Sequence, residues 1–198
     1  MSNNSFTRGS GLLEKYLTKK RAVLANGFIK SELRKGRILD IGCGFYPYFL
    51  INTNFKEKYG LDPSINLKLL ENKNLQIKKA KVDGLKMPFK NNYFDVVTML
   101  AVFEHIDKEK LVPVLKEARR ILKKNGLLII TTPAPWADIL LHNMAKVGLI
   151  SSEEIHEHKH NKKKSHITDI IKESGFEEDK IKSGFFELYM NMWFTSIK

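Results

Sequence analysis

A short apolar stretch followed by two closely spaced glycines most constrains how this chain folds. We interpret Ile38 to Ile41 as a buried strand. Gly42 and Gly44 then allow a tight turn with no side chain between the backbone and a ligand. Asp40 adds a carboxylate beside that turn. The three features together fit a nucleotide-like ligand, whereas a strand with Gly-x-Gly alone is also an ordinary α/β turn.

Strands and helices alternate five times up to residue 132, which predicts an α/β fold with a parallel sheet. The further strands are expected at residues 58–62, 75–82, 94–101 and 127–132. The acids and glycines of interest stand at strand ends, and ligands bind at the carboxyl edge of such sheets. Asp62 follows Gly44 by 18 residues, a spacing that suits a carboxylate accepting hydrogen bonds from two ribose hydroxyls. Asp83 and Gly84 end the third strand, where an adenine amino group would fit.

Hydrophobic periodicity places helices between and around these strands. They are expected at residues 11–33 (one long or two shorter helices), 48–52, 64–73, 107–122 and 165–174. Asp107 is predicted to cap the fourth helix, and Asn125-Gly126 to end it. Gly175-Phe176-Glu177 is expected to lead into a sixth strand, and the apolar residues that alternate from Phe186 to Phe194 predict a closing strand. We expect a single domain over 1–198, with an N-terminal helical segment at 1–35 and a lid-like insertion at 133–164.

The chain is strongly basic, with 34 Lys and Arg against 22 Asp and Glu, a net charge of +12. Such a charge attracts polyanions, namely RNA, anionic lipid or a phosphorylated substrate. The lysines are spread over many elements without a basic stripe interleaved with aromatics, so a general effect on solubility is the favoured account. We expect no DNA partner and disfavour RNA, while peripheral contact with a membrane stays open. The single cysteine and the lack of an 18-residue apolar run predict a cytoplasmic protein without a transmembrane segment.

Several motifs in order resemble one protein family, the class I S-adenosylmethionine-dependent methyltransferases, and in particular the small-molecule subset that opens with Leu-Asp-Ile-Gly-Cys-Gly. The resemblance extends from about Arg37 to Thr132. The matching pieces are Ile38–Gly44, Gly60-Leu61-Asp62, Val82–Phe89, Tyr93–Val97, Phe103-Glu104-His105-Ile106 and Ala118–Gly126.

The resemblance implies a Rossmann-like three-layer sandwich, whose seven-stranded, mostly parallel sheet has an antiparallel last strand. It implies S-adenosylmethionine as the cofactor. The cofactor-binding residues would be Asp40, Gly42 and Gly44 for the methionine part, Asp62 for the ribose, Asp83, Gly84 and Leu85 for the adenine, and Leu100 beneath the sulfonium. This chain departs from the family where a third glycine often follows Gly44, since it has Tyr46-Pro47 there.

Three histidines are candidates for acid–base catalysis. His105 follows the fourth predicted strand, near the expected methyl position, although a histidine that bonds within its own loop is the competing interpretation. His158 and His160 lie in the insertion and are expected to reach an acceptor hydroxyl, with Lys162–Lys164 meeting a phosphate. We expect no metal, because the histidine spacing lacks the carboxylate–histidine pattern of a zinc site.

The sequence therefore predicts methyl transfer to a hydroxyl, amine or carboxyl group of a small or phosphorylated precursor molecule, such as a saccharide or lipid-linked intermediate. Two alternatives remain open. One is an RNA methyltransferase, which residues 100–105 disfavour for base methylation because they lack the usual motif of base-modifying enzymes. The other is a non-catalytic, methyltransferase-like partner subunit.

Overall fold

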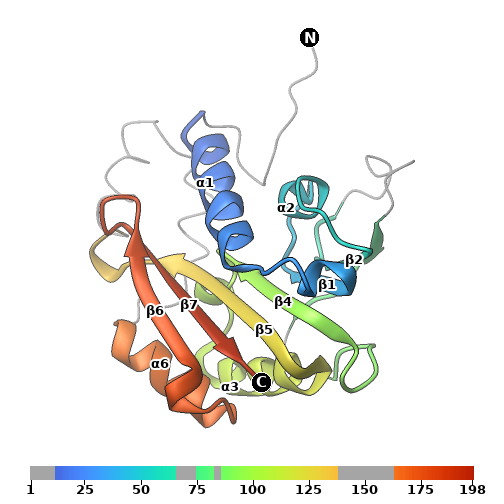
Figure 1. Cartoon of the computed structure of the whole chain (residues 1–198). Coiled ribbons are helices and arrows are strands. Elements are labelled where there is room, and N and C mark those ends of the chain that lie inside the picture. Colours follow the sequence, from blue (N-terminus) through green and yellow to red (C-terminus); the bar gives the residue numbers. More distant parts are fainter. Residues whose placement is uncertain (1–11, 66–74, 83–85, 138–162) are drawn as a thin grey trace.

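The computed structural model describes residues 12–65, 75–82, 86–137 and 163–198, and seven strands of this part form one sheet (Figure 1). The strand order is β3-β2-β1-β4-β5-β7-β6. Pairing is parallel from β3 to β5, and β7 is antiparallel to both β5 and β6. The strands are β1 Arg37–Ile41, β2 Glu57–Leu61, β3 Gln76–Lys78, β4 Phe94–Leu100, β5 Leu122–Pro133, β6 Ile181–Phe186 and β7 Asn191–Ile197. The predicted seven-stranded α/β fold with an antiparallel last strand is confirmed.

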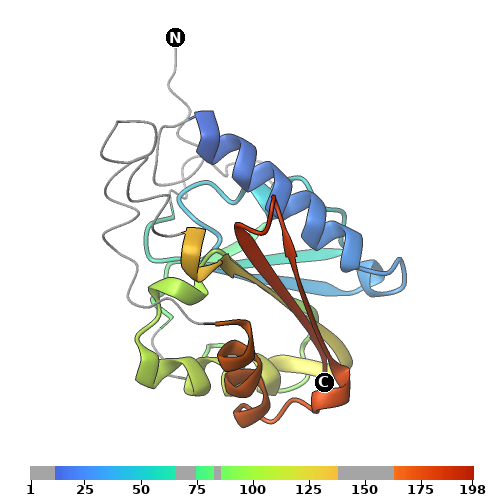
Figure 2. The same cartoon turned by 90° about the vertical axis from the view of Figure 1, so that its left-hand side faces the viewer.

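Helices cover both faces of the sheet and complete a three-layer sandwich (Figures 1 and 2). α1 and α2 lie on one face, and α3 and α6 lie on the other. The helices and short 3-10 segments are α1 Leu12–Phe28, η1 Leu33–Lys35, α2 Tyr48–Ile51, η3 Phe103–His105, α3 Lys108–Ile121, α6 Lys164–Glu173 and η4 Glu178–Lys180. Among the described residues, no helix has the length and apolar character needed to cross a bilayer.

β1 shows why the central strands are apolar throughout. Ile38 packs into the core beneath α1 and α2, whereas Leu39 and Ile41 pack into the core beneath α3 and α6. Successive side chains of a strand point to opposite faces, so a sheet covered on both faces needs apolar residues at nearly every position. Asp40 is the one polar side chain among the four buried positions of β1.

The predicted sixth strand after Glu177 is present, but the predicted closing strand does not run from Phe186 to Phe194. β6 ends at Phe186, a turn follows, and β7 begins at Asn191 and runs back along β6. Glu187, Leu188 and Tyr189 adopt left-handed backbone angles in the turn. The apolar alternation continues through this turn and no glycine or proline marks it, so the sequence pattern conceals the reversal.

Two smaller predictions at the ends of α3 also need correction. Asp107 precedes the helix as expected, but its carboxylate pairs with Lys110, 2.8 Å away, and caps no backbone group. Asn125-Gly126 does not end the helix, because α3 stops at Ile121 and β5 starts at once. Asn125, at φ +64°, instead turns the chain where β5 shifts register against β4. Two backbone hydrogen bonds hold that turn. The Asn125 N–H donates to the Lys198 carbonyl, and the Lys198 N–H donates to the Gly126 carbonyl.

Further differences concern length. The predicted third strand, 75–82, is reduced to the three residues of β3 at the sheet edge. The predicted helical segment 11–33 becomes α1 followed by a separate 3-10 turn, η1. The predicted helix 64–73 and the lid-like insertion at 133–164 lie mostly outside the described residues.

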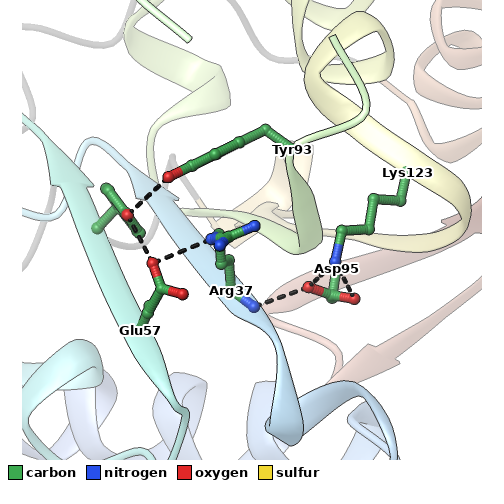
Figure 3. Close-up of polar contacts among 6 residues, drawn as sticks. Arg37, Glu57, Tyr93, Asp95 and Lys123 are labelled. Atoms are coloured by element: carbon green, nitrogen blue, oxygen red, sulfur yellow. Dashed lines mark hydrogen bonds and ion pairs between the residues drawn. The ribbon is translucent and has the colours of Figure 1, made fainter. Parts of the chain in front are cut away.

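Asp95 ties three elements together at the amino edge of the sheet, opposite the glycine turn (Figure 3). Its carboxylate accepts the backbone N–H of Arg37, at the start of β1, over 2.7 Å. It also pairs with Lys123 of β5 at 2.8 Å. Asp95 belongs to β4, so one half-buried carboxylate links β1, β4 and β5.

The side chain of Arg37 extends this network toward β2 (Figure 3). Its Nε donates to Glu57 at 3.0 Å, and its guanidinium lies over the Tyr93 ring at 4.4 Å. The Tyr59 hydroxyl donates to the same Glu57 carboxylate at 2.8 Å and meets the Tyr93 hydroxyl at 3.0 Å. These contacts lower the pKa of Glu57, with the Arg37 hydrogen bond as the main cause. The amino edge is therefore built for stability.

We expect Asp95→Ala to lower the free energy of unfolding by about 1–3 kcal/mol, because it leaves the Arg37 N–H without its acceptor. Chemical denaturation measures the change. Glu178→Ala is the matched control, since it removes a surface ion pair with Lys172 from a side chain that is 72% exposed. The control is expected to lose less than about 0.5 kcal/mol. Equal losses in the two variants would show that Asp95 is only a surface partner.

Candidate functional site

The glycine turn after β1 lies at the carboxyl edge of the parallel strands. Gly42 and Gly44 have φ angles of +73° and +79°, which side chains rarely adopt. The Gly42 N–H donates to the Leu61 carbonyl at the end of β2 over 2.7 Å. A Cβ on Gly42 would overlap the side chain of Val102, which follows β4. The turn is thus pinned between β2 and the segment after β4, and only glycine fits its first position.

Gly44 differs from Gly42 in having open space beside it. The only described atom near a Cβ built there is the Tyr46 carbonyl oxygen, 3.9 Å away. The backbone at Gly44 is therefore reachable by a ligand, which is the property that the sequence predicted. Tyr46-Pro47, in place of a third glycine, leads directly into α2, and the Tyr48 N–H donates to the Tyr46 carbonyl over 2.7 Å.

Asp62 follows β2 and joins two turns through its carboxylate. One oxygen accepts the Gly44 N–H at 2.9 Å, and the other accepts the Ser64 N–H at 2.7 Å. The residue is buried. Each carboxylate oxygen can accept a further hydrogen bond. Asp62 thus shapes the glycine turn and keeps acceptor capacity for a hydroxyl-bearing ligand.

Asp40 lies inside β1, opposite Gly60 of β2 and Thr98 of β4. The Thr98 hydroxyl donates to its carboxylate over 2.6 Å. Burial raises the pKa of Asp40 from its ordinary value of 3.8 to about 7, against the lowering effect of this hydrogen bond, and the negative charge of Asp62 contributes in the same direction as burial. A cationic ligand at this edge would stabilise the ionised form. Sequence reasoning missed Thr98, although a hydroxyl within an apolar strand is a visible signal.

The end of β4 bends sharply at the same edge. Leu100 is its last residue and is half-buried against the core beneath α1 and α2. Ala101 follows with φ +56°, an unusual angle for alanine, and its N–H donates to the Thr131 carbonyl of β5 over 3.0 Å. The bend carries Val102 onto the glycine turn.

The 3-10 turn η3 then places two polar residues at this edge. Glu104 is buried, and the Thr132 hydroxyl of β5 donates to its carboxylate over 3.1 Å. His105 is the next residue and is half-buried. The predicted location of His105 just after the fourth strand agrees with the structure, while its catalytic role stays a prediction. Glu104 was not singled out from the sequence, although it stands inside the Phe103–Ile106 motif.

Five of the predicted site residues lie outside the described part of the chain. They are Asp83, Gly84, Leu85, His158 and His160. The described ones come together as expected at one edge, from β1, β2 and β4. Within the described ranges, no three His, Cys, Asp or Glu side chains gather as a metal site would require.

Cys43 lies between the two glycines but does not act as an exposed nucleophile. Its side chain is buried in the core beneath α1 and α2, close to Gly60. Burial raises the pKa of its thiol, so the reactive thiolate is disfavoured. Cys43 is therefore a small buried side chain of the core.

Known proteins are similar in sequence to the central part of this chain. A family model described as a methyltransferase domain matches residues 39–130. An uncharacterized protein of Methanocaldococcus jannaschii is 41% identical over 93 residues, which is 47% of this chain and 39% of that protein. The probable tRNA methyltransferase 9B of Mus musculus is 28% identical over 105 residues, or 52% of this chain and 23% of that protein. The chain thus aligns with well under half of each of these two relatives.

Solved structures show the same fold. A protein of Thermotoga maritima, described as an S-adenosylmethionine-dependent methyltransferase and possible histamine N-methyltransferase, has a TM-score of 0.71 at 19% identity, covering 94% of this chain and 92% of its own. A second such methyltransferase, from Archaeoglobus fulgidus, has a TM-score of 0.68 at 19% identity, covering 93% and 94%. The family model thus matches 92 of the 198 residues, slightly less than half of the chain, and the solved structures share its fold, so the chain is similar to S-adenosylmethionine-dependent methyltransferases.

Proposed function

We propose that this protein transfers the methyl group of S-adenosylmethionine to a hydroxyl, amine or carboxyl group of a small or phosphorylated precursor molecule. One observation carries the proposal: two buried carboxylates and an open glycine backbone meet at the carboxyl edge of β1 and β2. A sulfonium cofactor with a ribose and an amino-acid tail needs cation stabilisation, hydroxyl acceptors and close backbone approach. This edge offers all three.

Each residue has a distinct part in holding the cofactor. Asp62 accepts the ribose hydroxyls with the lone pairs that Gly44 and Ser64 leave free. Asp40, Gly42 and Gly44 hold the methionine part. Asp83, Gly84 and Leu85 would hold the adenine, and Leu100 would contact the sulfonium end of the cofactor. The cofactor supplies an activated methyl group, so the protein contributes mainly orientation and charge stabilisation.

The acceptor side of the site is assigned to the segments that follow β4 and β5. His105 takes the proton of the acceptor group, next to the buried Glu104. His158 and His160 serve the same acceptor from the insertion, and the lysines at 162–164 bind a phosphate of a saccharide or lipid-linked precursor. General-base assistance adds about 10²–10⁴-fold, less than orientation does.

A second candidate, an RNA acceptor, is favoured by the similarity to the probable tRNA methyltransferase 9B. The chain's charge of +12 is compatible with it. Residues 100–105 lack the usual motif of base-modifying enzymes, and this absence argues against base methylation. A non-catalytic partner subunit is the third alternative.

Labelling an extract with S-adenosylmethionine tritiated on the methyl group distinguishes the three. We expect label in the small-molecule or lipid-extractable fraction. Label confined to RNA would replace the acceptor proposed here, and no transfer despite cofactor binding would favour the partner subunit. Once an acceptor is found, His105→Asn is expected to lower kcat by about 10²–10⁴-fold with cofactor affinity unchanged. His166→Asn on α6 is the control.

Asp62→Asn is expected to weaken cofactor binding by about tenfold or more, because the ribose hydroxyls lose a charged acceptor. The asparagine oxygen can still accept one backbone N–H, so the variant stays folded. Titration calorimetry with S-adenosylmethionine and its demethylated product measures the affinity. Asp169→Asn, at an exposed carboxylate of α6, is the control. An unchanged dissociation constant for Asp62→Asn would restrict Asp62 to shaping the turn.

Asp40→Asn is expected to stabilise the ligand-free protein at pH 8 while weakening cofactor binding. Because the pKa of Asp40 is raised to about 7, the folded state holds its proton more tightly than the unfolded state does, and ionisation lowers stability as pH rises from about 4 to 7. The amide avoids this cost, on the order of 2–4 kcal/mol. Thermal unfolding at pH 5 and pH 8 should show the larger gain at pH 8. A variant less stable than the parent at pH 8 would contradict this account.

A further inference from the structure

The turn between β6 and β7 carries the two most exposed large apolar side chains of the described chain. Leu188 is 88% exposed and Tyr189 is 68% exposed. Phe185, the neighbouring residue of β6, contacts the Tyr189 ring at a centroid distance of 5.5 Å. β6 and β5 are both antiparallel to β7, so β6 ends at the same edge as the parallel strands. The turn therefore lies at the edge that holds the cofactor site (Figure 1).

The backbone of this turn is unusual. Glu187, Leu188 and Tyr189 have successive φ angles of +51°, +54° and +65°, in a region that glycine or asparagine normally occupies. The strained turn is held by bonds at its base. The Glu187 carboxylate accepts from Asn191 Nδ2 over 2.6 Å, and the Met190 carbonyl accepts the Ala134 N–H over 2.8 Å. Strain that projects apolar side chains into water gains nothing for folding, which points to a function for the exposed side chains.

Other exposed aromatics surround the turn. Trp136 is 47% exposed and lies two residues beyond Ala134, whose N–H bonds the turn. Tyr16 of α1 is 52% exposed, and Lys20, which lies over the Tyr16 ring, is close enough to the turn for its charge to act on Glu187. We call Tyr16, Trp136, Phe185, Leu188 and Tyr189 the aromatic rim.

Lysines are interleaved with the aromatic rim. Lys164 Nζ lies 5.6 Å from the centre of the Phe185 ring, and Lys20 Nζ lies 5.2 Å from that of Tyr16. The carboxylate of Glu187, in the turn, lies close enough to α1 for the positive charges of Arg21 and Lys20 to act on it. Lys19 and Lys163 on the adjoining elements are exposed. The rim thus offers apolar side chains and positive charge together.

We propose that the aromatic rim docks on an anionic lipid membrane. Tyrosine and tryptophan favour the boundary between lipid and water, single apolar side chains on a projecting turn fit between lipid headgroups, and lysines bind anionic headgroups. A protein partner would be better matched by a groove or a flat face than by isolated side chains on a turn. Docking would turn the carboxyl edge, with the cofactor site, toward the membrane. The acceptor is then a lipid or lipid-linked molecule, a step that rests on the proposed function.

Vesicle co-sedimentation of the full chain tests the docking itself. The probes are vesicles of phosphatidylcholine alone and of equal parts phosphatidylcholine and phosphatidylglycerol. We expect binding to the anionic vesicles only, weakened by salt. Leu188→Ser with Tyr189→Ser should lower the partition coefficient at least about tenfold. Val23→Ser is the matched control, since Val23 is 62% exposed on α1 but lies seven residues beyond Tyr16. It should bind as the parent does.

Three outcomes would overturn the proposal: no binding of the parent protein to anionic vesicles, equal binding by the Leu188/Tyr189 variant, or equal loss in the Val23 control. A thermal unfolding curve of each variant shows that the fold is retained. An RNA oligonucleotide that binds the parent while the vesicles do not would also contradict a membrane partner. Because the assay needs neither cofactor nor turnover, its failure leaves the methyltransferase proposal standing, and a failure of cofactor binding leaves the docking result standing.

Discussion

The carboxylate of Asp62 is the contact on which the candidate site depends. It binds the N–H of Gly44 with one oxygen and the N–H of Ser64 with the other, and so fixes the turn after β1 against the end of β2. Backbone N–H groups in such turns have no partner within a strand or helix, and a buried N–H without an acceptor is costly. The acid that a ribose would use is therefore also the acid that shapes the glycine turn.

Asp40, in contrast to Asp62, lowers the stability of the ligand-free protein when it is ionised. A buried carboxylate near another one is expensive to ionise, and a single threonine hydroxyl offsets only part of that cost. Such an arrangement is poor for the stability of the free protein. It is favourable for binding a cation, because the ligand gains an electrostatic partner that is already desolvated and held in place. At the other edge Arg37 pairs with Glu57 and Lys123 pairs with Asp95, so each of these charges has a partner, as a purely structural site requires.

Sequence reasoning anticipated the sheet and the described part of the site because both depend on local patterns. Buried parallel strands need continuous apolar runs, and a close-approach turn needs glycines, so Ile38 to Gly44 is informative on its own. Thr98 and Glu104 were missed because each is far in sequence from its hydrogen-bond partner, which is Asp40 for Thr98 and Thr132 for Glu104. The turn at Glu187 to Met190 was missed because its left-handed residues are not the ones that normally adopt those angles.

The distribution of charge over the molecule differs between the glycine turn and the aromatic rim. The chain has a net charge of +12, yet the two ionisable oxygen-bearing side chains buried at the glycine turn, Asp40 and Asp62, are acids. A cationic cofactor is repelled by the chain as a whole and attracted only at short range, where burial strengthens the field of Asp40 and Asp62. An anionic surface or acceptor is attracted by the whole chain and meets lysines and aromatics at the same edge. On the proposed function, the buried acids would hold the cofactor and the lysines would face the acceptor, so opposite charges would separate the two ligands at this edge.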